Sequence, residues 1–98
     1  MNSELKVIRK TLISNEVTEF DLEIPSYEVI VKNLTDGCIY VYCGESASGF
    51  DTDKSIKINA NMGQLVFMNN EYDLEFSFDK LYIKSESGGE VELQIIGF

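Results

Sequence analysis

The 98-residue sequence contains no histidine and no tryptophan, a single proline and only two cysteines. Histidine is the commonest general base and transition-metal ligand, and it supplies the usual charge switch near neutral pH. Its absence removes histidine-based catalysis, histidine metal centres and a histidine pH switch from the functions to be expected. The apolar content of 44% is ordinary for a folded domain, so wholesale disorder is not expected.

Basic residues are also scarce. Eight Lys and Arg stand against seventeen Asp and Glu, which gives a net charge of −9. Three of the cations, Lys6, Arg9 and Lys10, lie in the first ten residues, where the net charge is +2, so the rest of the chain carries −11. Such a body repels nucleic acids and anionic membranes, and neither is an expected partner. This charge distribution either serves solubility alone, or the basic arm docks on the acidic surface of a neighbour.

The two cysteines, Cys38 and Cys43, are five residues apart in one expected strand. Extended backbone would separate their Cα atoms by roughly 16 Å, whereas a disulfide requires about 7 Å or less. We therefore expect two free thiols, which are typical of a reducing compartment. The N-terminal sequence lacks the apolar core of a signal peptide, and no apolar run reaches membrane-spanning length.

Convincing helical patterns are lacking too, whereas alternating apolar and polar residues recur along the chain. Alternation with a period of two is typical of half-buried antiparallel strands. Eight or nine short strands at roughly ten-residue spacing predict an all-β, antiparallel β-sandwich or jelly-roll-like domain over residues 1–98. Residues 1–13 are expected to form the first strand or an extended N-terminal arm.

The strongest local signal is the stretch Tyr27–Cys43, in which two β-prone runs flank a polar turn with Asp36-Gly37. This pattern predicts a β-hairpin. A second hairpin is predicted from residues 80–85 and 90–96, with glycines at its tip. Residues 72–78 alternate again and predict a further strand, and Val91, Leu93 and Ile95 are expected to face the core.

No motif for catalysis, cofactor binding or metal binding is recognisable, and we expect no enzyme activity, no cofactor and no catalytic residues. Three carboxylates, Glu45, Asp51 and Asp53, share one polar loop, but their spacing is not that of a dedicated calcium motif. We expect a solvated loop there, with Phe50 packed back onto the core. Neither thiol has the electropositive surroundings of a catalytic cysteine.

The predicted central hairpin has an unusual second face. If Val29, Val31, Ile39 and Val41 face the core, then Ile30, Tyr40 and Tyr42 point outward; a register slip of one residue would exchange the two sets. Other strands present acidic outer faces, whereas this one is partly apolar. The face formed by Ile30, Tyr40 and Tyr42 is therefore covered by another part of the chain, or serves as a subunit interface or an aromatic ligand platform.

Three groups of residues form recognisable short patterns: Val31, Asn33, Thr35, Asp36, Ile39, Tyr40 and Val41, then Ile56 and Ile58, and then Leu81, Tyr82 and Ser85. These patterns resemble those of small all-β virion proteins of tailed phages and prophages of Gram-positive bacteria. The turn at residues 58–63 is longer here and lacks the proline of that family.

This resemblance implies a non-enzymatic structural or accessory role, such as a decoration, head or tail protein, in a virion or in the bacterial cytoplasm. It implies a homo-oligomer that could also contact other virion proteins. The alternative is a carbohydrate- or ligand-binding module that uses its surface tyrosines.

Overall fold

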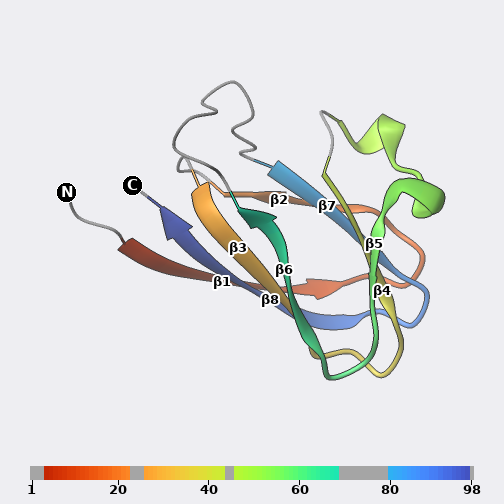
Figure 1. Cartoon of the computed structure of the whole chain (residues 1–98). Helices are drawn as coiled ribbons and strands as arrows, with labels where there is room; N and C mark the ends of the chain where they lie inside the picture. The colour runs from red at the N-terminus through yellow and green to blue at the C-terminus, as the bar shows by residue number, and fades with distance from the viewer. Residues whose placement is uncertain (1–3, 23–25, 44–45, 69–79, 98) are drawn as a thin grey trace.

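The computed structural model of the chain describes residues 4–22, 26–43, 46–68 and 80–97. Within these ranges the chain forms eight β-strands and two short 3₁₀ helices, and none of its helical segments is long or apolar enough to cross a membrane (Figure 1). The strands are β1 (Glu4–Leu12), β2 (Thr18–Asp21), β3 (Ser26–Asn33), β4 (Ile39–Tyr42), β5 (Ile56–Ile58), β6 (Gly63–Met68), β7 (Lys80–Ser85) and β8 (Gly89–Gly97). The 3₁₀ helices are η1 (Ala47–Gly49) and η2 (Thr52–Lys54).

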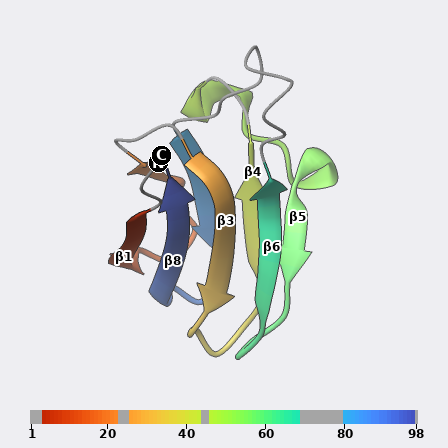
Figure 2. The ribbon, with the colours of Figure 1, turned by 60° about the vertical axis from the view of Figure 1, so that its left-hand side comes forward.

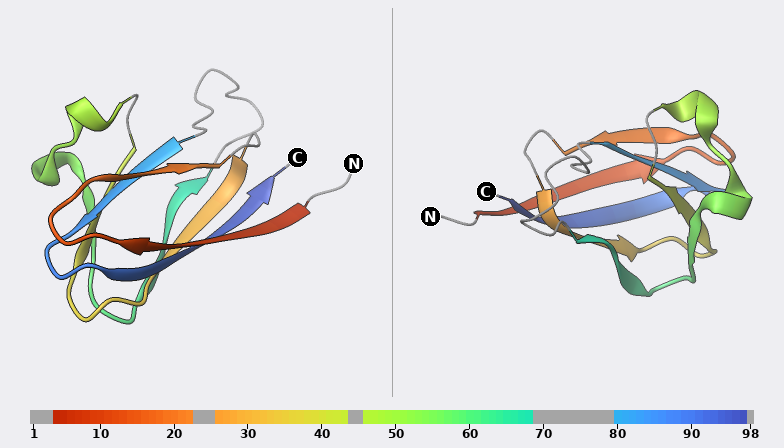
Figure 3. Two further views of the ribbon diagram at one scale, coloured as in Figure 1. Left: turned by 180° about the vertical axis from the view of Figure 1, so that it is seen from behind. Right: turned by 45° about the horizontal axis from the view of Figure 1, so that its top comes forward.

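The strands form two antiparallel sheets of four. One sheet has the order β1-β8-β3-β6, which Figure 2 shows from left to right, and the other has the order β2-β7-β4-β5. Figure 3 shows the sheets stacked on one another, with η1 and η2 at the end of the molecule away from the two termini. The prediction of an all-β chain with antiparallel sheets is confirmed, and the two-layer arrangement fits a β-sandwich.

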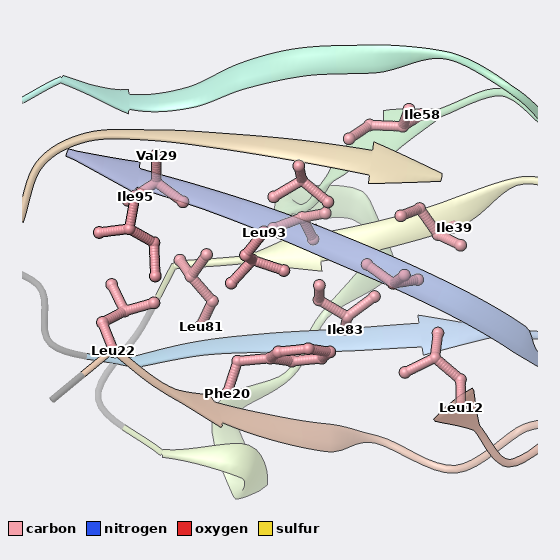
Figure 4. Close-up of a cluster of buried hydrophobic side chains, with 13 residues drawn as sticks. Leu12, Phe20, Leu22, Val29, Ile39, Ile58, Leu81, Ile83, Leu93 and Ile95 are labelled. Atoms are coloured by element: carbon pink, nitrogen blue, oxygen red, sulfur yellow. The ribbon is translucent and has the colours of Figure 1, made fainter. Parts of the chain in front are cut away.

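The core lies between the sheets and is built from the residues of both sheets whose side chains point inward (Figure 4). Phe20 and Leu22 fill it from the β2 side, and Val91, Leu93 and Ile95 line it along β8, all fully buried. One of the two alternative core sets is also confirmed, because its residues are buried: Val29, Val31, Ile39 and Val41. Local alternation therefore identifies the inner faces of β3, β4 and β8 correctly.

The predicted central hairpin is wrong. β3 lies between β8 and β6 in one sheet, and β4 lies between β7 and β5 in the other. Both sides of β3 are thus already hydrogen-bonded, and β4 cannot pair with it. The connection at residues 34–38 carries the chain from one sheet to the other, so the Asp36-Gly37 turn is a corner between layers.

The second predicted hairpin is wrong for the same reason, since β7 and β8 also belong to different sheets. The glycines of the connection do adopt the expected positive φ, +70° at Gly88 and +121° at Gly89. An added Cβ at Gly89 would lie 3.0 Å from the Thr35 side chain, so the two corners pack directly against each other. The strand predicted at residues 72–78 lies outside the described residues.

The N-terminal segment is a strand of the fold. β1 pairs with β8 over its whole length, from Glu4 opposite Gly97 to Leu12 opposite Gly89. Lys10 donates to the backbone oxygen of Glu19 at 2.9 Å, and its ammonium lies 5.1 Å from the centre of the Phe20 ring. The first strand, one of the two alternatives for this segment, is therefore the arrangement observed, and Lys10 is used within the chain.

The corner after β3 is held by the side chain of Asn33, which is fully buried. Its Nδ2 donates to the carbonyl of Gly37 at 2.8 Å and to that of Ile58 at 3.0 Å. Its Oδ1 accepts from the backbone N–H of Thr35 at 2.9 Å and from the Thr35 hydroxyl at 2.7 Å. Because Ile58 ends β5, one amide group joins the end of β3, the corner turn and a strand of the opposite sheet.

Replacing Asn33 with Ala should destabilise the protein by about 2–4 kcal/mol, because buried groups left without partners cost about 1–3 kcal/mol each. Urea denaturation followed by circular dichroism measures the change. Asn59→Ala, at an exposed position of the next turn, is the matched control and should alter the stability by less than about 0.5 kcal/mol. Equal stability of the two variants would contradict the role assigned to Asn33.

Candidate functional site

The three residues predicted to form one outer face are each half-buried and point away from the core, but they do not lie together. Ile30 belongs to β3 and therefore to the outer face of the β1-β8-β3-β6 sheet. Tyr40 and Tyr42 belong to β4 and to the outer face of the β2-β7-β4-β5 sheet. The single predicted face is thus corrected to two faces on opposite sides of the molecule. We call them the apolar face and the tyrosine face, respectively.

The apolar face centres on Ile30. The strand registers place Gln94 opposite both Val7 and Ile30, and Ile30 opposite Leu65, so these four residues form a row across the sheet. Leu5 pairs with Ile96 in a neighbouring row. Leu5 is 69% exposed, and Val7 and Leu65 are each 46% exposed. Five apolar side chains therefore share this surface: Leu5, Val7, Ile30, Leu65 and Ile96.

A charged row runs beside these apolar residues. Arg9 and Lys32 both lie opposite Glu92 in register, one on each side. The Arg9 Nε donates to Glu92 Oε1 at 2.7 Å, Gln94 donates to Oε2 at 3.1 Å, and the Lys32 Nζ lies 3.9 Å from Oε2. Only 7% of Glu92 remains exposed. The hydrogen bonds from Arg9 and Gln94 hold the pKa of the Glu92 carboxyl below its ordinary value.

The tyrosine face contains a packed aromatic cluster. Tyr42 lies opposite Tyr82 of β7, with ring centres 6.4 Å apart, and the Phe50 ring meets the Tyr42 ring edge-on at 5.7 Å. The Tyr82 hydroxyl donates to Glu19 at 3.3 Å, and Tyr82 itself is only 2% exposed. The expectation that Phe50 returns to the core is thus corrected, since it packs on the outside of the sheet and covers Tyr42.

Tyr40 occupies a different setting on the same face. It lies opposite Lys84 of β7 on one side and Lys57 of β5 on the other. A side-chain hydrogen bond with Cys38 is the main reason that the pKa of the Tyr40 hydroxyl is raised. The row Lys84–Tyr40–Lys57 therefore offers two cations and one phenol.

Cys38 and Cys43 are both free, as predicted, and both are half-buried. The carboxylates of the polar loop do not assemble a site in the described ranges, where no group of three or more His, Cys, Asp or Glu could hold a metal ion. Instead, the Asp51 carboxylate accepts a hydrogen bond from the Asp53 N–H at 2.9 Å and caps η2. Glu45 lies outside the described residues.

Comparison of the chain with protein-family models, with curated proteins and with solved structures finds no match. The candidate sites are therefore defined by their own geometry.

Glu92 should make stability depend on pH. Because its pKa is lowered in the folded state, its contribution is present above the ordinary carboxyl pKa of 4.5 and is lost as the pH falls through the folded value. Glu92→Gln should therefore lower the urea midpoint at neutral pH, and the difference from the unmodified protein should shrink in acid. Glu90→Gln, at an exposed position of the same strand, is the control. A difference that stays constant with pH would refute the assignment.

Burial raises the pKa of the Cys43 thiol, so a smaller fraction is thiolate at mildly alkaline pH and alkylation slows. In a Cys38→Ser variant, iodoacetamide should modify Cys43 more slowly in the native protein than in the urea-unfolded protein, as measured by mass spectrometry. The protein without substitutions, unfolded in urea in the absence of reductant, should take up two alkyl groups. Failure to do so would reveal a disulfide and contradict the free thiols.

Proposed function

We propose that the chain is a jelly roll. The support is the strand order, in which strands 1, 8, 3 and 6 form one sheet and strands 2, 7, 4 and 5 form the other. Among consecutive described strands, only β4 and β5 are neighbours in one sheet. Eight-stranded, double-sheet jelly rolls occur in viral capsid proteins and in lectin domains. Because a fold does not fix a function, the choice between these roles depends on the surfaces.

We infer that the protein is a non-enzymatic structural or accessory protein of a phage or prophage particle, in the head, the tail or as a decoration, and that it acts by self-association. The observation that carries the self-association is the apolar face, with Leu5, Val7 and Leu65 each about half or more exposed. Removing apolar surface from water contributes about 25 cal/mol for each Å² buried. The assignment to phage particles is supported by the sequence resemblance alone.

The apolar face can supply most of such a contact. Four strands spaced about 4.8 Å apart and up to nine residues long span roughly 19 by 30 Å, or about 600 Å² in projection. A standard interface buries about 800 Å² on each partner. The outer face of this sheet therefore provides about three quarters of a standard interface, and adjoining surfaces would provide the rest.

Charge repulsion between other surfaces favours the apolar face as the site of self-association. The chain carries −9 overall, so most pairings of its surfaces bring like charges together. The apolar face is less acidic, because Arg9 and Lys32 offset two of the three carboxylates that alternation places there, Glu28, Glu90 and Glu92. Self-association through this face avoids most of the acidic surface, which then limits other contacts. We include in this proposal that the protein contacts other virion proteins and that it resides in the virion or, before the particle forms, in the bacterial cytoplasm.

A second candidate function is ligand binding at the tyrosine face. Tyr42 is engaged with Phe50 and Tyr82, but Tyr40 forms no aromatic pair within the described residues and keeps part of its surface exposed. A tyrosine with an apolar ring and a polar tip suits contact with a small polar ligand. This observation favours a module that binds a carbohydrate or another small ligand through Tyr40.

The self-association proposal predicts a multimer in solution. Replacing both Val7 and Leu65 with Ser should weaken the association roughly tenfold or more, since each change removes about 1 kcal/mol of buried apolar surface. Analytical ultracentrifugation over a range of concentrations measures the shift. Met62→Ser, which alters an exposed apolar residue on a turn, should leave the assembly unchanged. A protein that remains monomeric at high concentration would rule the proposal out.

A further inference from the structure

Within the described residues, two lysines of the tyrosine face, like Lys54 of η2, lack the ion pairs that other cations of the chain form. Arg9, Lys32 and Lys80 each lie within 4.0 Å of a carboxylate oxygen. Lys57 and Lys84 form no such ion pair with any residue in the described ranges. They nevertheless lie in one row, on either side of Tyr40, in a protein with more than twice as many acidic as basic residues. Two lysines without an ion-pair partner in the described part of the chain thus flank Tyr40 and attract an anion, and the Glu86 carboxylate that acts on Tyr40 reduces this attraction.

We propose that the row Lys84–Tyr40–Lys57 binds an acidic sugar chain of the uronate class. A sugar ring packs on Tyr40, and carboxylates along the chain pair with the two ammonium groups. This inference rests on the second candidate function, ligand binding at Tyr40, and adds the chemical class of the ligand. It involves the sheet opposite the apolar face and is independent of self-association.

The spacing of the row suits an extended chain. Lys84, Tyr40 and Lys57 lie directly opposite one another on β7, β4 and β5, so the two lysine positions are two strand spacings apart, about 10 Å. A ligand that runs across the strands would meet a cation, an aromatic ring and a second cation in succession. The Tyr40 oxygen, whose O–H is engaged with Cys38, can accept a hydrogen bond from a sugar hydroxyl at the centre of this row.

The same surface is poorly suited to a nucleic acid or a protein. Nucleic-acid binding relies on many cation–phosphate contacts, and this row offers only two cations in a protein of net charge −9. Protein interfaces concentrate their binding energy in large, exposed apolar or aromatic anchors. Among the described residues, the large exposed hydrophobic side chains are Leu5, Val7, Ile13, Leu34, Met62 and Leu65, none of which belongs to β2, β7, β4 or β5. A sugar chain requires no such anchors.

Titration calorimetry with an oligogalacturonate and with a neutral cello-oligosaccharide of equal length tests the inference. We expect the uronate to bind more tightly than the neutral sugar. Its affinity should fall as the salt concentration is raised, because salt screens exposed ion pairs. Lys57→Gln with Lys84→Gln should weaken binding roughly fivefold to tenfold, and Tyr40→Ser should weaken it for both sugars. Lys80→Gln, on the same face but already paired with Glu19, is the control and should bind as the unmodified protein does.

Each contrary result has a defined meaning. Equal binding of the two sugars, or no effect of the double lysine change, would overturn the uronate class and leave ligand binding at Tyr40 standing. No binding of either sugar would overturn both. Inorganic phosphate that binds as tightly as the oligogalacturonate would reduce the site to a simple anion site and overturn the sugar assignment. Circular dichroism of each variant confirms that a loss of binding is not a loss of fold.

Discussion

The hydrogen bonds of one buried amide, the Asn33 side chain, stabilise the corner at which the chain passes from β3 in one sheet to β4 in the other. The chain must leave β3, turn in five residues and enter the opposite sheet as β4, and each backbone group exposed by that turn needs a partner. Asn33 supplies several of these partners, since it donates to Gly37 and Ile58 and accepts from Thr35, and the Leu34 N–H donates to the Glu90 carbonyl. The Cβ position of Gly89 lies against Thr35, so the corner between β7 and β8 packs on the same point. The stacking of the two sheets thus depends on polar contacts at their rim as well as on the apolar core.

The inner faces of the strands were predictable because alternation is a local property. Val29, Ile39 and Leu93 are buried where the pattern placed them, and the first strand follows from the β-branched residues near the N-terminus. Pairing between strands was not predictable in the same way. The turn at Asp36-Gly37 has the chemistry of a hairpin, yet the choice between a hairpin and a corner depends on which other strands already flank β3. Those strands, β8 and β6, begin about thirty residues or more later in the chain.

The grouping of the candidate residues into faces also depended on strand pairing that the local sequence does not reveal. Sequence reasoning identified Ile30, Tyr40 and Tyr42 as outward-facing, which is the part that alternation determines. It grouped them on one surface because it took their strands to be neighbours. The residues that actually surround Ile30 are Val7, Leu65 and Gln94, and the pairs that place them there join distant parts of the chain. One available signal was that β1 and β8 carry apolar residues on both sides of the strand, such as Leu5 and Ile8, or Ile95 and Ile96.

The burial of Asn33 has a consequence for how the protein can be made. Asn33-Leu34-Thr35 has the sequence of an N-glycosylation acceptor, but the nitrogen that would carry the glycan is fully buried and donates to two carbonyl oxygens. A glycan at this position is sterically incompatible with the corner. In a eukaryotic secretory pathway, any chain glycosylated there before folding is barred from the native structure, whereas bacterial cytoplasmic synthesis avoids the modification altogether.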